Sequence, residues 1–276
     1  MTGPAGAPPP DPAELLDLAV DIAQRAGRLL VEERPDGELD MATKTSSTDI
    51  VTTMDTAAEE LIADAVRKAR PDDGMLGEEG VDTPGTSGVR WVVDPIDGTV
   101  NYLYRYPAWA VSIAAEVDGE VVAGVVHAPA LGETWTASRG GGARLDGRVL
   151  RVGEPRDLAQ SLIATGFGYA ATDRAWQADI VRAVLPRVRD IRRGGSAAID
   201  LCSVAAGRVD GYYERGCNPW DLAAGGLVAR EAGAVVGGSN GAPAGYDLVL
   251  AAPPTLFAAL HDLVAARFDA LDPKDR

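Results

Sequence analysis

Residues 91–99, Trp-Val-Val-Asp-Pro-Ile-Asp-Gly-Thr, are the most informative stretch of the chain. The apolar residues at its start predict a buried strand that ends in a carboxylate, Asp94. Pro95 is expected to stop the pairing of this strand, and Asp97-Gly98 predicts a tight turn. A helix that begins near Thr99 would present free backbone N–H groups to an anion. One turn could therefore offer two carboxylates to cations and several amides to a phosphate.

Two acids around a turn do not by themselves make a site, because Asp97-Gly98 could be only a turn and Asp94 only a cap. Other acids stand in similar settings elsewhere in the chain. Glu78 lies in the segment Gly-Glu-Glu-Gly at 77–80, and Asp221 follows Asn-Pro-Trp at the start of a predicted helix. Asp55 lies in the first turn of another predicted helix, where the helix dipole alone would favour an acid.

The composition restricts the chemistry that the chain can support. It has 276 residues, with 26 basic and 41 acidic side chains, and a net charge of −15. Such a charge argues against binding to nucleic acid or anionic lipid. It would also repel an anionic substrate unless cations intervene, although an acidic surface can simply favour solubility.

Cysteine and histidine are too few for several kinds of site. Two cysteines, Cys202 and Cys217, fit neither a disulfide framework nor a zinc site, and only His127 and His261 occur. Oxygen ligands remain, and these favour magnesium or manganese. The sequence has no run of eighteen apolar residues and no signal peptide, so we expect a location in the cytoplasm, without membrane association.

The pattern of apolar residues predicts a layered α/β fold. Residues 1–10 are expected to form a disordered tail. An N-terminal half, 11–155, should contain helices at 12–33 and 54–69 and strands at 90–94, 108–117, 120–127 and 133–137, with a hairpin turn at Asp118-Gly119. The C-terminal half, 156–276, should complete one structural unit. Its strands are expected at 161–165, 188–192, 209–213, 234–236 and 247–251, and its helices at 173–184, 196–206, 220–232 and 254–266.

Taken together, the motifs resemble the inositol monophosphatase family from about residue 13 onward, and bacterial inositol-1-monophosphatases most of all. The motifs are K-T-S-S-T-D-I-V-T-T-M-D at 44–55, G-E-E, W-x-x-D-P-I-D-G-T-x-N and W-D-x-A-A-G at 220–225, with further family segments at 194–198 and 212–214. The resemblance implies an α-β-α-β-α layered sandwich of the inositol monophosphatase and fructose bisphosphatase type. It also implies a homodimer.

The resemblance implies magnesium-dependent hydrolysis of a small phosphate monoester, with myo-inositol 1-phosphate as the expected substrate. Two or three magnesium ions would bind, manganese could replace them, and lithium would inhibit. Histidinol phosphate, fructose bisphosphate and phosphoadenosine phosphate stay open as substrates, although the compact loops after residue 80 favour a monophosphate over a nucleotide bisphosphate. A regulatory binding role on the same fold also stays open.

The resemblance assigns roles residue by residue. Glu78, Asp94 and the Ile96 carbonyl would hold one magnesium, and Asp94, Asp97 and Asp221 a second, with Glu78 also serving a third. Thr99 would orient the attacking water, and Asp55 would accept its proton. The residues expected to contact the substrate are Gly98, Thr99, Gly195, Ser196, Ala197, Glu214 and Asp221. Lys44 and Asp49 lie on the loop that closes over the third metal in relatives.

Several conspicuous residues are expected to be structural. Trp91 and Trp220 should pack in the core, as should Cys202. The run of glycines at 140–142 should be a turn, since no Lys and no helix-opening Ser or Thr follows it. Asp146-Gly147 should form a hairpin. Three charged side chains are expected to face solvent: Glu154, Arg192 and Arg193.

Overall fold

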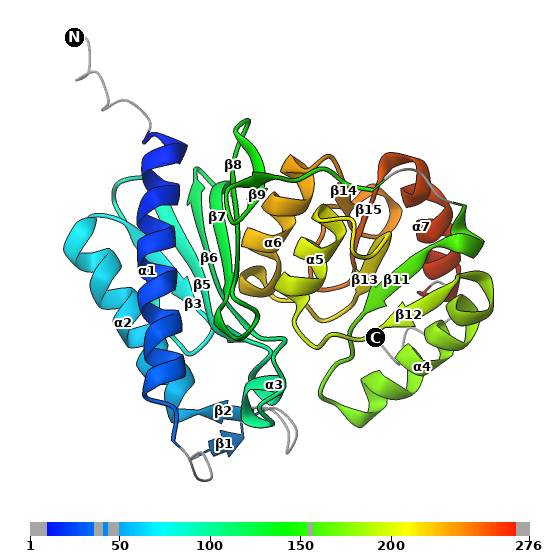
Figure 1. Cartoon of the computed structure of the whole chain (residues 1–276), viewed down its shortest axis with the longest axis horizontal. Coiled ribbons are helices and arrows are strands. Elements are labelled where there is room, and N and C mark those ends of the chain that lie inside the picture. Colours follow the sequence, from blue (N-terminus) through cyan, green and yellow to red (C-terminus); the bar gives the residue numbers. More distant parts are fainter. Residues whose placement is uncertain (1–9, 36–40, 44–49, 154–156, 269–276) are drawn as a thin grey trace.

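The structure, a computed structural model, describes residues 10–35, 41–43, 50–153 and 157–268 (Figure 1). The expected tail up to residue 9, the loop residues Lys44 and Asp49, and Glu154 lie outside the described residues. Within the described ranges, no helix combines the length and the apolar composition needed to cross a membrane.

Two N-terminal helices form the first outer layer, α1 (Pro12–Glu32) and α2 (Thr53–Ala69). The Asp11 side chain accepts a hydrogen bond from Ala13 N at 2.9 Å and caps α1. The helix buries an apolar stripe against the neighbouring sheet, as its 3.6-residue period requires (Figure 1). The buried side chains of this stripe include Leu15, Ala19, Ile22, Ala26 and Leu30.

An eight-stranded sheet forms the second layer, in the order β10-β9-β8-β7-β6-β5-β3-β4. Only β3 and β5 run parallel, so most of the sheet is a meander. Its strands are β3 (Gly74–Gly77), β4 (Asp82–Thr83), β5 (Val89–Asp97), β6 (Ala110–Val117), β7 (Glu120–Ala128), β8 (Glu133–Ser138), β9 (Gly142–Leu145) and β10 (Arg148–Val149). A separate hairpin pairs β1 (Met41–Thr43) with β2 (Ile50–Thr52), and α3 (Thr99–Leu103) follows β5.

The remaining layers come from the C-terminal half. Helices α5 (Ala197–Ala205) and α6 (Pro219–Glu231) pack between the two sheets. The second sheet has the order β12-β11-β13-β15-β14. Its strands are β11 (Leu162–Thr165), β12 (Asp190–Arg192), β13 (Gly211–Glu214), β14 (Val235–Gly237) and β15 (Val249–Ala252). Helices α4 (Ala171–Val184) and α7 (Pro254–Phe268) cover its outer face (Figure 1).

The layers thus follow the order helices, sheet, helices, sheet, helices, which confirms the expected α-β-α-β-α sandwich (Figure 1). The middle layer packs closely because small residues face it. A Cβ atom at Gly225 would lie 3.0 Å from the Ala198 carbonyl oxygen, and one at Gly124 would lie 3.0 Å from Ala224 Cα. Short 3-10 helices connect some elements, at Pro129–Leu131, Leu158–Gln160, Leu185–Arg187 and Ser239–Gly241.

The sequence located the long elements to within a few residues, and both aspartate-glycine hairpins are confirmed. Asp118 and Gly119 have φ values of 51° and 81°, as the two-residue turn between β6 and β7 requires. Asp146-Gly147 forms the corresponding turn between β9 and β10. The short strands β3, β4, β9 and β10 were not predicted.

The predicted end of the central strand was wrong. Pairing between β5 and β6 does not stop at Pro95, because Asp94 pairs with Ser112 and Asp97 pairs with Ala110. Three residue steps on β5 therefore match two on β6, which is a β-bulge. The missing N–H of Pro95 is accommodated in this bulge, and the strand continues to Asp97.

Candidate active site

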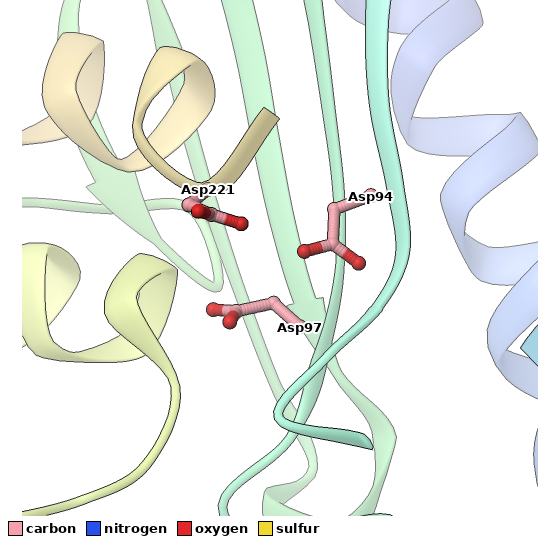
Figure 2. A group of neighbouring side chains, drawn as sticks. All are labelled: Asp94, Asp97 and Asp221. Carbon is pink, nitrogen blue, oxygen red and sulfur yellow. The ribbon is translucent and has the colours of Figure 1, made fainter. Parts of the chain in front are cut away.

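Asp94, Asp97 and Asp221 bring their carboxylates together although Asp221 is distant in sequence. Each offers one oxygen atom, and these atoms all lie within 4.8 Å of one another (Figure 2). In a regular strand, residues three apart point to opposite faces. The bulge inserts an extra residue between Asp94 and Asp97, which lets both side chains face the same space.

The backbone around each of these aspartates fixes its carboxylate. Asp94 accepts a hydrogen bond from Ile96 N at 2.9 Å. Asp221 lies in the first turn of α6, where it accepts one from Asn218 N at 2.6 Å. Positioning thus comes from a bulge for one residue and from a helix N-terminus for the other.

Asp97 also joins β5 to the N-terminus of α5. Its Oδ2 atom accepts hydrogen bonds from Ser196 Oγ at 2.6 Å and from Ala198 N at 2.7 Å. Ser196 is buried, and its hydroxyl caps α5 by accepting from Ile199 N. Ser196 therefore does not line the cavity as the sequence suggested, because its hydroxyl is committed to Asp97. Gly195 and Ala197, on either side of it, do line the cavity.

Glu78 lies beside the same cluster, directly after β3. Its backbone N–H donates to Val93 O at 3.1 Å, and its carboxyl group shares a hydrogen bond with Asp94. The loop that carries it is held by Glu59, whose buried carboxylate accepts from Glu79 N at 2.8 Å and Val81 N at 3.0 Å.

Burial and mutual repulsion raise the pKa of each clustered aspartate. Loss of hydration raises the pKa of Asp94 and Asp221 well above the usual range, and neighbouring carboxylates raise it further. The pKa of Asp97 rises to about 6, because burial outweighs its hydrogen bonds from Ser196 and Ala198. Divalent cations would relieve this repulsion, and a set made only of oxygen ligands fits magnesium or manganese.

Thr99 and Asp55 form a second unit next to the cluster. Thr99 opens α3, and its hydroxyl lies 3.1 Å from Asp55 Oδ1 and 3.0 Å from the Ile96 carbonyl oxygen. A single O–H can donate to only one of them at a time. The other Asp55 oxygen accepts from Thr52 N at 2.8 Å and Thr52 Oγ1 at 2.5 Å, in a capping box at the start of α2. Burial raises the pKa of Asp55 to about 6.

A cavity of about 420 Å³ opens from the acidic cluster. Glu78, the three aspartates, Ile96, Gly98 and Thr99 line its inner end. Glu214, at the end of β13, lines another wall and accepts a hydrogen bond from the buried Tyr212 hydroxyl at 2.7 Å. Burial raises the pKa of Glu214 to about 7. Aromatic and cationic residues complete the outer part of the lining: Phe167, Tyr169, Trp176, Arg193, Arg215, Trp220 and Tyr246.

Some functional contacts were not visible in the sequence. Asn101 donates through Nδ2 to Ala108 O at 2.6 Å and to Gly194 O at 2.9 Å, and so links the two halves beside the cavity. Arg193, expected only to face solvent, also lines the cavity, whereas its neighbour Arg192 does not. The asparagine stands in the recognised motif, but its partners are remote in sequence.

Most residues expected to be structural are so. Trp91 is fully buried and donates to Asp73 Oδ2 at 2.9 Å, and Cys202 is fully buried. The glycines at 140–142 form a turn, whose amides at Gly140 and Gly142 donate to Glu231. Trp220 packs partly against the core but also lines the cavity.

The profile of the inositol monophosphatase family matches residues 11–271. The chain belongs to this family. An inositol-1-monophosphatase from Mycobacterium bovis is 43% identical over 286 aligned positions, which cover 96% of this chain and 98% of the relative. A protein named Nus factor SuhB from Escherichia coli K12 is 43% identical over 229 positions, covering 82% of this chain and 86% of the relative.

Solved structures agree with this assignment. The extragenic suppressor protein suhB of Bartonella henselae superimposes with a TM-score of 0.85 at 38% identity, covering 91% of this chain and 98% of that structure. The Thermotoga maritima IMPase gives a TM-score of 0.85 at 34% identity, covering 93% and 99%. The family comprises metal-dependent phosphatases, and the acidic cluster is a place where a cation could bind.

Proposed function

We propose that the chain hydrolyses a small phosphate monoester with Mg²⁺, and that myo-inositol 1-phosphate is its substrate. The observation that carries the proposal is the convergence of the Asp94, Asp97 and Asp221 carboxylates within 4.8 Å at the inner end of a cavity. Oxygen ligands at this spacing suit a pair of cations that share them. The relatives named as inositol-1-monophosphatases support the choice of alcohol.

The expected ligands are Glu78, Asp94, the Ile96 carbonyl, Asp97 and Asp221. When bound, the cations would acidify a water molecule and neutralise phosphate oxygens. Thr99 would accept a hydrogen bond from the attacking water while it donates to Asp55, a geometry for which the 3.1 Å contact is suited. Asp55, with a pKa near 6, would then accept the proton, since a base works best when its pKa lies near the working pH.

The alcohol part of the substrate would occupy the wall opposite the cluster. Glu214 would accept hydrogen bonds from substrate hydroxyls, and the Tyr212 hydroxyl holds one of its oxygens in place. Gly195 and Ala197 would line this wall, and the amides of Gly98 and Thr99 would contact the phosphate. Gly98 has φ of +95°, and a Cβ there would lie 3.0 Å from Ala108 O, so the position requires glycine.

The test is phosphate release with and without Mg²⁺ from four substrates: myo-inositol 1-phosphate, histidinol phosphate, fructose 1,6-bisphosphate and phosphoadenosine phosphate. We expect Mg²⁺-dependent turnover, highest for inositol 1-phosphate, that Asp94→Asn abolishes because it removes a shared ligand without changing shape. The absence of Mg²⁺-dependent release from any of the four would refute the proposal. Higher turnover of another ester would instead reassign the alcohol.

A second role, as a regulatory binding protein, is favoured by the relative named Nus factor SuhB. The acidic composition argues that such a role would act through protein partners and not through direct contact with nucleic acid. Affinity capture with Asp97→Asn, compared with the wild type, would test it. Retention of the same partners by the inactive variant would make binding independent of catalysis.

We also infer a homodimer in the cytoplasm, from the family resemblance. Sedimentation equilibrium would give the oligomeric state directly. A monomer at micromolar concentration would contradict the inference.

A further inference from the structure

Two arginines stand at the outer part of the cavity, far in character from its acidic inner end. Arg193 directly follows β12, and Arg215 directly follows β13. Both line the cavity that contains the aspartate cluster. The function proposed above assigns neither of them a role.

The sheet topology places the two arginines on the same edge. Strand β11 lies between β12 and β13 and runs parallel to both. The carboxyl ends of all three strands therefore meet at one edge, the usual place for a ligand in such sheets. Because neighbouring strands lie about 4.8 Å apart, β12 and β13 are roughly 10 Å apart across β11. Two arginine side chains at that spacing can reach one common group.

Neither guanidinium is used within the protein. Among the residues that the structure describes, neither Arg193 nor Arg215 forms a salt bridge or a side-chain hydrogen bond. Each instead lies over an aromatic ring of the cavity wall. The distance from the guanidinium carbon to the ring centroid is 5.9 Å for Arg193 over Phe167 and 5.0 Å for Arg215 over Trp176. The adjacent Arg192, by contrast, is paired with Asp190 at 2.6 Å.

Stacking on a ring fixes the plane of a guanidinium but leaves its N–H groups free to donate at the edge. Two such groups on one wall are suited to the oxygens of a phosphate, which guanidinium binds through paired hydrogen bonds. In a chain with 41 acidic and 26 basic side chains, two arginines without carboxylate partners in a ligand cavity need an explanation. An anion that arrives with the substrate provides one.

A competing explanation is that the arginines only balance buried acids. Arg193 does lower the pKa of Asp200 and Glu214 through its charge. No such effect of Arg215 on an acid was found among the described residues, so balance explains at most one of the pair.

We propose that the cavity takes a small polyol carrying two phosphates, one hydrolysed at the aspartate cluster and the other held by Arg193 and Arg215. This rests on the proposed function, because it assumes that the first phosphate binds at the cluster. It differs from that proposal in the substrate, since a monophosphate would leave both guanidinium groups unused.

The experiment compares myo-inositol 1-phosphate with myo-inositol 1,4-bisphosphate, which adds a phosphate across the same ring. We expect kcat/KM to be roughly ten-fold or more higher for the bisphosphate, since hydrogen bonds to charged groups are worth about 1.5–3 kcal/mol each. ³¹P NMR identifies which phosphate leaves. Arg215→Met keeps an apolar stem over Trp176 but removes the charge, and Arg193→Met does the same over Phe167. In each variant the preference should fall toward parity.

The ratio of the two substrates is measured within each variant, so a loss of folded enzyme cancels. Arg192→Met is the matched control, because Arg192 is adjacent, exposed and outside the cavity, and it should leave the ratio unchanged. Arg215→Lys should keep part of the preference, since it keeps the charge without the planar fork.

Equal use of the two substrates by the wild type would overturn the inference. So would a loss in Arg215→Met that is the same for both, which would mean that the arginine acts on the scissile phosphate or balances acids. Failure to hydrolyse either ester with Mg²⁺ would instead count against the proposed function, so the two failures are distinguishable.

Discussion

Asp97→Asn should stabilise the metal-free protein while it removes activity. The substitution keeps the shape of the side chain and keeps an oxygen that can accept from Ser196 Oγ and Ala198 N, so the link to α5 survives. What it removes is a buried negative charge within 4.8 Å of two others. Loss of that charge should favour the folded state whenever no cation is bound.

The size of the effect follows from the pKa of Asp97. A carboxyl group with a pKa of about 6 in the folded protein and 3.8 in the unfolded chain binds its proton more tightly when folded. Its contribution to stability is complete below pH 3.8 and is lost as the pH rises through about 6. At pH 7.5 the loss is roughly 3 kcal/mol, since one pKa unit corresponds to about 1.4 kcal/mol. Asn, which cannot ionise, should regain up to this amount, or roughly 6–12 °C in Tm for a chain of this size.

Thermal unfolding in EDTA and in excess Mg²⁺ measures both consequences. In EDTA at pH 7.5, Asp97→Asn should unfold above the wild type, and the gap should shrink as the pH falls toward 4. Mg²⁺ should raise the Tm of the wild type far more than that of the variant. Asp73→Asn is the control, because Asp73 is buried but paired with Arg70 and accepts from Trp91 and Ser87, so this change should destabilise without altering the Mg²⁺ response.

The reasoning is refuted if Asp97→Asn lowers the Tm in EDTA as Asp73→Asn does. That result would mean that the hydrogen bonds to the charged carboxylate outweigh its burial and repulsion. An unchanged Mg²⁺ response in Asp97→Asn would show separately that Asp97 is not a ligand.

Three further outcomes are expected. Thr99→Ala and Asp55→Asn should each lower kcat by roughly 10²–10⁴ with little change in Mg²⁺ affinity; the double variant should be little worse, and losses that multiply would contradict a shared role. Millimolar lithium should lower turnover by competing for the carboxylates, and full activity in roughly 100 mM lithium would contradict this. The KM for a polyol phosphate should fall as the pH rises through about 7, because ionised Glu214 accepts from hydroxyls, and Glu214→Gln should remove that dependence.

Local sequence signals predicted what local interactions determine. Asp118-Gly119 specifies its own turn, because both residues tolerate positive φ, and Asp11 caps α1 through a neighbour two positions away. The short strands β3, β4, β9 and β10 lack such signals. Their two to four residues include glycines and charged side chains, and they exist because longer strands pair beside them.

Long-range packing decided what the sequence could not. The register between β5 and β6 creates the bulge that turns Asp94 and Asp97 to one side. The strand order β12-β11-β13 brings Arg193 and Arg215 to one cavity. Ser196 lies in a recognised segment, but only the position of Asp97 reveals that its hydroxyl serves a carboxylate and not a ligand.

The arrangement of helices explains how so many acids tolerate one another in a folded chain. Asp55 lies in the first turn of α2 and Asp221 in the first turn of α6, and Asp97 accepts from an amide at the start of α5. The N-terminus of a helix carries partial positive charge, so three such ends face the acidic region and offset part of its repulsion. The offset is incomplete, since the pKa of Asp97 still rises to about 6 and that of Asp221 rises well above its usual range. The helix ends thus keep the ligands ordered, and the uncompensated charge that remains is what would attract a cation.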